Sequence, residues 1–248
     1  MNWGLFIFAV VMLAAGGSLL WWRKRVGQEI ALMAATPTSK TAEVAKLAPG
    51  TVAEVKGMLR CAAPLTAELS KQACVFFKSD VQREVVYYQT DSQGKRERKT
   101  RTENLQSSTR FAPCLVEDDS GQVAIHLDGA DIEGQQEVVN RRVPEPHNLA
   151  ATMVGIAISG GADSATRIYT ETILATNIPI YVLGEVAADH GIGKPAANSK
   201  NRVFVVSTKS EEERSKSLGS SMTWILVFAV LCFAAAAALA FFAIKAAV

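Results

Sequence analysis

The sequence predicts a membrane protein in which two transmembrane helices flank one β-rich domain. Hydrophobic residues make up 49% of the 248 residues, at the upper edge for a globular protein, and they are concentrated at the two ends of the chain. Between the ends, short alternating or β-branched runs are separated by turn signals, as in a barrel or sandwich. The net charge of +2 argues against a dedicated nucleic-acid-binding protein.

The two apolar segments are long enough to cross a bilayer. Trp3–Trp22 and Met222–Ile244 contain no Asp, Glu, Arg or His. About 20 apolar residues in a helix span about 30 Å of hydrocarbon. All four Trp residues lie at the edges of these segments, where indole rings prefer the membrane interface. Small residues at Ala14–Ser18 and Ala234–Ala238 either let helices associate closely or are simply tolerated there.

Basic residues beside these segments predict the orientation in the membrane. Arg23–Arg25 follow the first segment, and positive residues favour the cytoplasmic side. Lys209, Arg214 and Lys216 precede the second segment and agree, whereas Lys245 after it opposes. We expect the domain in the cytoplasm and both termini outside. A cleaved signal peptide is the alternative for the first segment, but the basic start and the cleavage motif are missing.

These signals divide the chain into five segments. They are the first transmembrane helix with its basic flank at 1–25, a helical connector at 26–48, the β-rich domain at 49–209, a capped helix at 210–221 and the second transmembrane helix at 222–245. Within the connector, Thr36 and Pro37 suit the N-cap and first position of a short helix. Ser210 and Glu213 form a capping box, so we expect a helix that runs from Ser210 into the membrane without a break.

Alternation and β-branched content predict the strands of the domain. The expected strands are residues 53–59, 74–81, 85–89, 151–159, 166–172, 180–186 and 203–207. Two further apolar runs flank Asp118–Gly121, which predicts a hairpin turn. Glu133–Asn148 lacks a strand pattern and contains two prolines, so we expect a loop or a short helix there.

A basic segment lies between two strand-like arms. It contains five basic residues: Lys95, Arg96, Arg98, Lys99 and Arg101. Neither alternating face is apolar, so we expect a hairpin tip that projects beyond the core. Three roles remain open for it: a solvated hairpin that prevents edge pairing, contact with anionic lipid or protein, and binding of nucleic acid beside Tyr87 or Tyr88. Nucleic acid is the least favoured partner.

Signals for catalysis or metal binding are sparse. The four Cys residues are Cys61, Cys74, Cys114 and Cys232, and no two form a C-x-x-C pair. Cys114 and His126 are the candidate for a catalytic thiol pair across the Asp118–Gly121 hairpin, although a core Cys and a strand His explain them more simply. We therefore expect no catalytic, cofactor-binding or metal site, and reduced thiols in the cytoplasm.

Ordered blocks in the domain resemble the GIDE domain, also called BAM, of membrane-anchored ubiquitin ligases and many bacterial proteins. The blocks are Pro49-Gly50, Ala53–Gly57, Pro64-Leu65, Cys74–Phe77, Val81, Phe111, Asp118–Ile125, Gly129-Ala130, Arg167–Leu174, Tyr181–Glu185 and Ser207–Glu213. The resemblance covers about residues 48–214. Lys71 and Asn177 stand where the family usually has Gly, and Asn tolerates the left-handed conformation required there.

The resemblance implies a family of E3 ubiquitin ligases, but a RING needs eight Cys or His ligands for its two zinc sites. Four Cys residues cannot supply them, so the ligase activity does not carry over. By analogy we expect an OB-like small barrel. We expect a non-catalytic scaffold for other membrane proteins or a homo-oligomer, located in a bacterial inner membrane. The alternatives are an accessory to a RING-bearing ligase partner and a thiol enzyme using Cys114.

Overall fold

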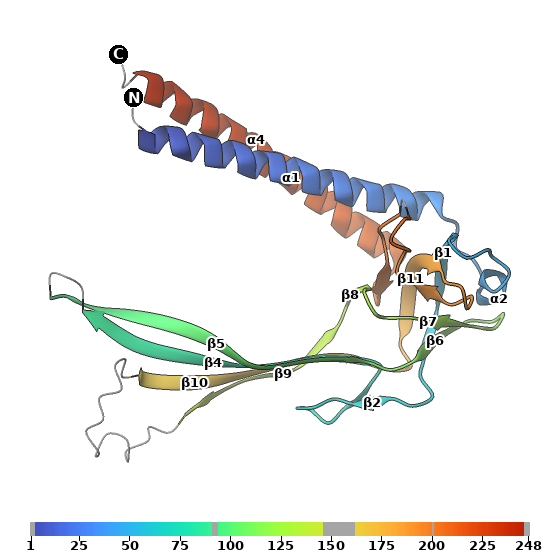
Figure 1. Ribbon diagram of the computed structural model, residues 1–248. Helices are drawn as coiled ribbons and strands as arrows, with labels where there is room; N and C mark the ends of the chain where they lie inside the picture. Colours follow the sequence, from blue (N-terminus) through green and yellow to red (C-terminus); the bar gives the residue numbers. More distant parts are fainter. Residues whose placement is uncertain (1–2, 91–93, 146–161, 200, 246–248) are drawn as a thin grey trace.

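The computed structural model describes residues 3–90, 94–145, 162–199 and 201–245. Two long helices stand at the ends of the chain, α1 (Trp3–Ala35) and α4 (Glu211–Lys245). They run side by side in opposite directions, and the described strands lie between them in the sequence (Figure 1). The expected class, two apolar helices flanking a β-rich domain, is confirmed.

Five strands close into a small barrel. Its members are β1 (Val52–Arg60), β6 (Cys114–Glu117), β7 (Gln122–Ile125), β12 (Ile192–Gly193) and β11 (Pro179–Val186). They pair in that order, and β11 then pairs with β1 to close the ring. The pairing is antiparallel except between β12 and β7. Two short strands, β13 (Val205–Ser207) and β8 (Asp131–Glu133), extend from β11.

Alternate residues of these strands fill the barrel core. Val55, Leu59, Val116, Val182 and Ile192 are fully buried and belong to one apolar cluster. Burial of each such side chain contributes about 1.5–3 kcal/mol relative to exposure. The period-2 pattern in the sequence therefore identifies the residues that close the barrel.

A second sheet of four long strands projects from the barrel. Its order is β5 (Arg96–Phe111), β4 (Phe76–Thr90), β10 (Ala162–Leu174) and β9 (Gln136–Pro144). The 15 residues of β4 extend over about 50 Å. The base of the sheet is anchored in the domain, where Phe76 contacts Phe111 with ring centroids 5.2 Å apart. Its outer part is a single layer that points to the same side of the barrel as the helices (Figure 1).

The remaining elements are short and cover the domain. β2 (Leu65–Thr66) and β3 (Ala73–Cys74) form a small hairpin near the base of the long sheet. The helix α2 (Thr41–Val44) lies against the β6–β7 turn, where Thr41 donates hydrogen bonds to Asp118.

The structure corrects three of the expected elements. The short helix expected from Pro37, with Thr36 as its N-cap, begins instead at Thr41, because Thr38 pairs with Glu54 of β1. The strands expected at 74–81 and 85–89 are mostly one strand, β4. The loop or helix expected at Glu133–Asn148 is wrong, since most of this segment forms β9. Pro144 is tolerated there because it ends an edge strand.

Other expectations are confirmed. Ser210 and Glu213 exchange the two hydrogen bonds of the capping box, and α4 runs on without a break. Lys71 and Asn177 have φ of 62° and 58°, the conformation that glycine adopts most easily. The strand expected at 151–159 lies outside the described residues.

Candidate functional site: the helix pair and the long sheet

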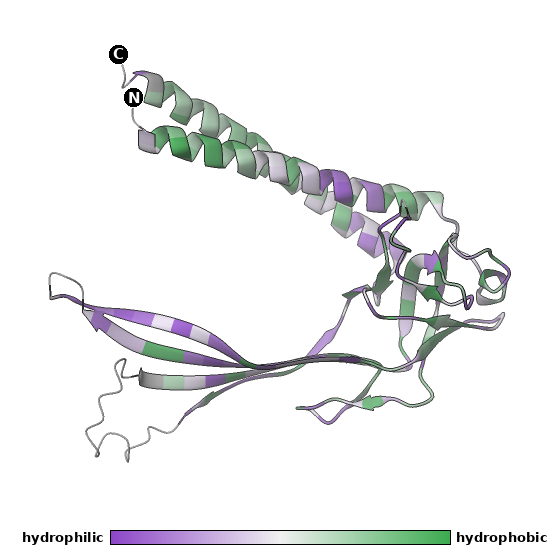
Figure 2. Cartoon of the chain, viewed as in Figure 1, coloured by the Kyte–Doolittle hydropathy of each residue, from purple (hydrophilic) through white to green (hydrophobic). Residues whose placement is uncertain are grey.

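The outer parts of α1 and α4 expose apolar side chains that water does not solvate well. In Figure 2 the outer parts of both helices are coloured as hydrophobic, and hydrophilic residues lie nearer the barrel. In the most apolar stretch of each helix, only 11% of α1 and 17% of α4 is buried inside the protein. The core helix of a soluble protein would bury most of such a surface. By length and composition both helices could cross a membrane.

Small residues bring the two apolar helices together. In the apolar parts of the helices the buried small residues are Ala9 and Gly16 in α1 and Ala229, Ala236 and Ala243 in α4, with Ile225 buried beside them. These small residues recur every seven positions within each helix, as in coiled-coil packing. A Cβ on Gly16 would lie 2.9 Å from the Phe233 ring, so any larger residue there requires the ring to move. The small residues expected at Ala14–Ser18 and Ala234–Ala238 thus contribute to pairing within the chain.

A network of ion pairs connects the helix pair to the barrel. Arg214 of α4 is 4% exposed, and its Nη2 atom lies 2.7 Å from Glu29 Oε1 of α1 and 3.2 Å from Asp131 Oδ2 of β8. Its Nη1 atom also donates to Glu133, which accepts a further bond from Lys209. Burial opposes ionisation of Glu133, but these two cations outweigh it and lower its pKa. The network joins α1, α4 and β8, and Met33 of α1 adds apolar packing against Tyr181 and Leu183 of β11.

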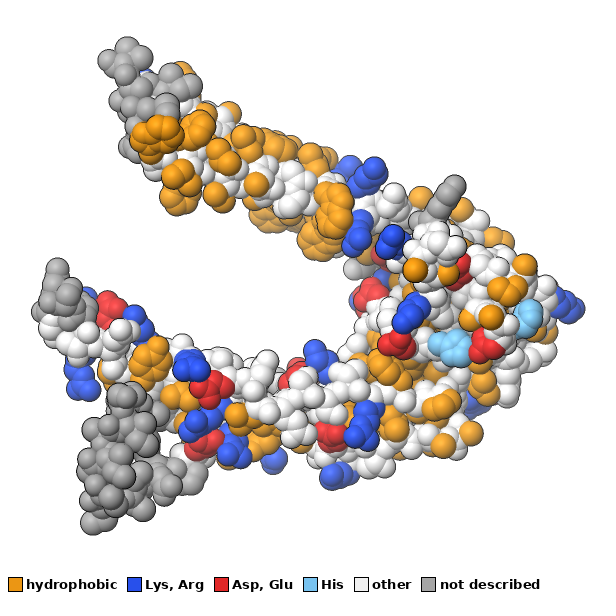
Figure 3. All heavy atoms as spheres, in the orientation of Figure 1, with side chains coloured by type: hydrophobic (Ala, Val, Ile, Leu, Met, Phe, Trp, Pro, Cys, Tyr) orange, Lys and Arg blue, Asp and Glu red, His pale blue; other side chains and the backbone are white. Residues whose placement is uncertain are grey.

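The basic segment lies at the free end of the long sheet. Its five basic residues are exposed, and all except Lys95 belong to β5. Arg96 lies over the ring of Tyr88, with its Cζ atom 5.2 Å from the ring centroid. Figure 3 shows these charged strands facing the apolar helices across a wide open space. The segment therefore projects beyond the core, as expected, on the side where the helices extend.

The structure does not bring Cys114 and His126 together. Cys114 is buried in the barrel core, where its thiol donates to the carbonyl oxygen of Ile125, and burial raises its pKa to about 12. The His126 side chain is half exposed, and its Nε2 atom lies 2.8 Å from Asp189 Oδ2. The two side chains thus occupy opposite sides of the barrel wall, and the thiol is protonated at neutral pH.

The burial of two carboxylates, Glu54 and Glu171, is not predicted by the sequence pattern. Glu54 lies on the face of β1 expected to be exposed, yet it is fully buried and accepts hydrogen bonds from Tyr181 and Thr38. Glu171 of β10 accepts the backbone N–H groups of Leu69 and Ser70 and so holds the loop between β2 and β3. The hydrogen-bond partners come from distant parts of the sequence, and no local signal indicates them. Both groups have structural roles.

The part of the chain that the structure describes holds no group of three or more His, Cys, Asp or Glu residues arranged for a metal ion. The prominent features are instead surfaces: an exposed apolar helix pair and an uncovered sheet.

The GIDE family model, described as an E3 ubiquitin ligase, matches residues 83–241, more than half of the chain. The chain belongs to the GIDE family. The match in this GIDE protein begins within β4 and ends within α4, so it includes most of the long sheet and most of the second apolar helix. The earlier blocks, up to Val81, precede the matched range. No curated protein and no solved structure matches the chain.

Proposed function

We propose that this GIDE protein is a membrane-anchored, non-catalytic scaffold. In this proposal α1 and α4 cross the bilayer, the Arg214 network fixes the barrel beside it, and the long sheet is the docking surface for other membrane proteins or a second copy. The observation that carries the proposal is the outer part of the sheet, which no further layer of the described residues covers (Figure 1).

A single-layer sheet is an unusual structure for a protein that acts alone. Sheets normally bury at least one face against another layer. Here Leu105 of β5 is 48% exposed and Val143 of β9 is 40% exposed, while Tyr88 of β4 is also exposed. The outer edge of β5 lacks a neighbouring strand among the described residues. Such an edge can accept a strand from a partner, with backbone hydrogen bonds supplying affinity.

The basic end of the sheet supports a position at the lipid surface. The sheet and helices leave the barrel toward the same side, and charged side chains are costly inside hydrocarbon. We infer that the helices cross the bilayer at a tilt and that the sheet extends along the headgroups. Each basic residue near an anionic surface contributes about 1 kcal/mol. This arrangement assigns the five basic residues to anionic lipid.

Lipid contact can be tested in the full chain. A dye is attached at Gln89→Cys in a Cys61→Ser background, and the protein is placed in nanodiscs of phosphatidylcholine with or without phosphatidylglycerol. We expect a blue shift of the dye only with the anionic lipid at low salt. Replacing the basic residues at 95, 96, 98, 99 and 101 with Gln should abolish the shift. Equal emission in both lipids would show that the segment is a solvated hairpin that does not contact anionic lipid.

Docking can be tested by photo-crosslinking in native membranes. A photoreactive residue at Leu105 reports on the sheet, and the same residue at Asp128, on the exposed barrel surface, is the matched control. We expect defined crosslinked products, either heterologous or between two copies, only from Leu105. If neither position gives a product, the sheet does not dock a protein.

The family description favours a second candidate, an accessory of a ubiquitin-ligase system. This function requires a partner chain that carries the RING. The same crosslinking experiment distinguishes the two candidates, because the product from Leu105 would then contain a RING protein. A product without one supports the general scaffold.

We further propose that the body faces the cytoplasm of a bacterial inner membrane with both termini outside. The support is the basic cluster at Arg23–Arg25, at the end of the apolar part of α1 nearer the barrel.

A further inference from the structure

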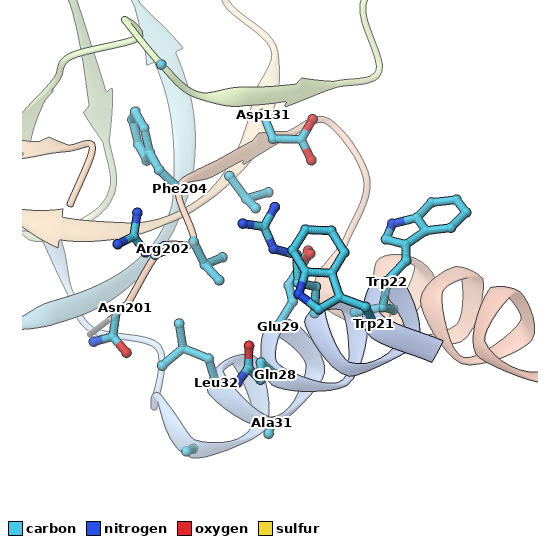
Figure 4. A pocket seen from close by; sticks show the side chains of 16 residues that line it. Trp21, Trp22, Gln28, Glu29, Ala31, Leu32, Asp131, Asn201, Arg202 and Phe204 are labelled. Carbon is cyan, nitrogen blue, oxygen red and sulfur yellow. The ribbon is translucent and has the colours of Figure 1, made fainter. Parts of the chain in front are cut away.

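A cleft of about 810 Å³ lies beside α1, between the apolar part of the helix and the barrel. One wall is α1 from Trp21 to Ala35, and the other is formed by residues 201–205 with Asp131 of β8 (Figure 4). Its volume is within the range of ligand-binding clefts. Trp21 and Trp22 stand at one end, and indole rings mark the headgroup level of a bilayer. The cleft therefore opens where lipid headgroups would lie.

The charges in the cleft favour an anion. Its two carboxylates, Glu29 and Asp131, are both paired with Arg214. Its two guanidinium groups, Arg25 and Arg202, have no carboxylate within ion-pair distance in the described ranges. Arg25 is held over the ring of Trp21, with its Cζ atom 4.5 Å from the centroid. Arg214 and Lys209 offset two of the three carboxylate charges of Glu29, Asp131 and Glu133. Arg25 and Arg202 therefore leave the cleft and its network with a net positive charge of one.

We propose that this cleft binds the headgroup of an anionic glycerophospholipid, with Arg25 and Arg202 on the phosphate. A guanidinium group matches phosphate through paired N–H donors. Gln28 and Asn201 add amide donors, and Leu32 offers apolar surface for the glycerol and acyl region. The remaining positive charge disfavours the ammonium group of a zwitterionic headgroup. The inference rests on the membrane anchoring proposed above, but not on the role of the long sheet.

The test is lipid retention by the full chain in neutral detergent, measured by native mass spectrometry during titration with phosphatidylglycerol. We expect one tightly retained lipid, with weaker binding of phosphatidylcholine. The double variant R25Q/R202Q should bind phosphatidylglycerol about tenfold more weakly. The matched control K40Q/K78Q, which removes the same charge at exposed positions outside both the cleft and the basic segment, should keep the wild-type affinity.

A single variant and two further ligand measurements decide the proposal if the double variant does not fold. If R25Q/R202Q does not fold, judged by its thermal melt, R202Q alone serves, because Arg202 is exposed and forms no ion pair with a described residue. Unchanged affinity in these variants, or equal affinity for phosphatidylcholine, would overturn the proposal. Binding of glycerol 3-phosphate without any retained lipid would assign the cleft to a soluble phosphate ester and also overturn it. Failure of anchoring is recognised separately, by release of the chain from membranes without detergent.

Discussion

Arg214 of α4 and Glu29 of α1 form an ion pair in which Nη2 and Oε1 are 2.7 Å apart, although 185 residues separate them in the chain. Because Arg214 also contacts Asp131 and Glu133 of β8, its guanidinium group joins both helices to the barrel, together with the apolar packing of Met33 against β11. The helices therefore transmit their orientation to the domain rigidly rather than through a flexible linker.

Removing this guanidinium should destabilise the protein strongly. The variant R214M leaves Glu29 and Glu133 without their common partner, and loss of one member of a buried ion pair costs about 3 kcal/mol. The change is measured as the free energy of unfolding of the β-rich domain, from denaturant titration in detergent. The control K194Q removes an ion pair whose two side chains are 64% and 74% exposed, and it should have little effect. Equal effects of the two variants would refute the rigid junction.

Enlarging Gly16 should separate the apolar helices. In G16L the new side chain collides with Phe233, and overpacking of this kind costs about 1–3 kcal/mol. Gly17 provides a matched control, since a Cβ there would meet no atom within 4 Å. We expect a lower melting temperature in detergent for G16L and an unchanged one for G17L. Unchanged melting of both variants would show that the helices do not pack through this surface.

The Asp118 carboxylate should make stability depend on acid pH. Burial opposes its ionisation, but hydrogen bonds from Ser120 and Thr41 outweigh burial and lower its pKa. A lowered pKa contributes stability that is present above the unfolded value near 4 and is lost as pH falls below it. The variant D118N should be less stable than wild type at pH 7, and the difference should shrink below about pH 4.

The matched control for this pH dependence is D119N. The Asp119 side chain is 77% exposed and forms an ion pair with Lys40, so its replacement should change the free energy of unfolding little. Unfolding free energies measured across the pH range decide the matter. A constant difference between D118N and wild type at every pH would contradict the assignment.

Cysteine labelling should reveal the orientation in the membrane. Cys61 is partly exposed, whereas Cys74 and Cys114 are buried, so only Cys61 reports on the folded body. In intact cells, a maleimide that cannot cross the membrane should leave Cys61 unlabelled. The same reagent should label Cys61 after the cells are permeabilised. A cysteine introduced at Asn2 should show the opposite behaviour. Labelling of Cys61 in intact cells would place the body outside.

The sequence predicts the elements whose signals are local. The apolar lengths of α1 and α4, the capping box at Ser210 and the alternation in β1 each depend on neighbouring residues, and each is confirmed. The edge strand β9 is missed because both its faces are largely exposed and therefore carry no period-2 pattern.

Features that depend on distant residues are not readable from the sequence. The burial of Glu54 requires Tyr181, which lies 127 residues further along the chain. The Arg214 network and the cleft beside α1 likewise form only when the helices meet the barrel. The basic segment was recognisable from its composition, but its position on the same side as the helices follows from the fold alone.

Extraction of native membranes with alkaline carbonate tests the central claim that both apolar helices cross a bilayer and carry the domain at its surface. The account predicts that the full chain stays in the membrane pellet and enters solution only when detergent is added. Release of the folded chain by carbonate alone, as for a peripheral protein, would contradict it.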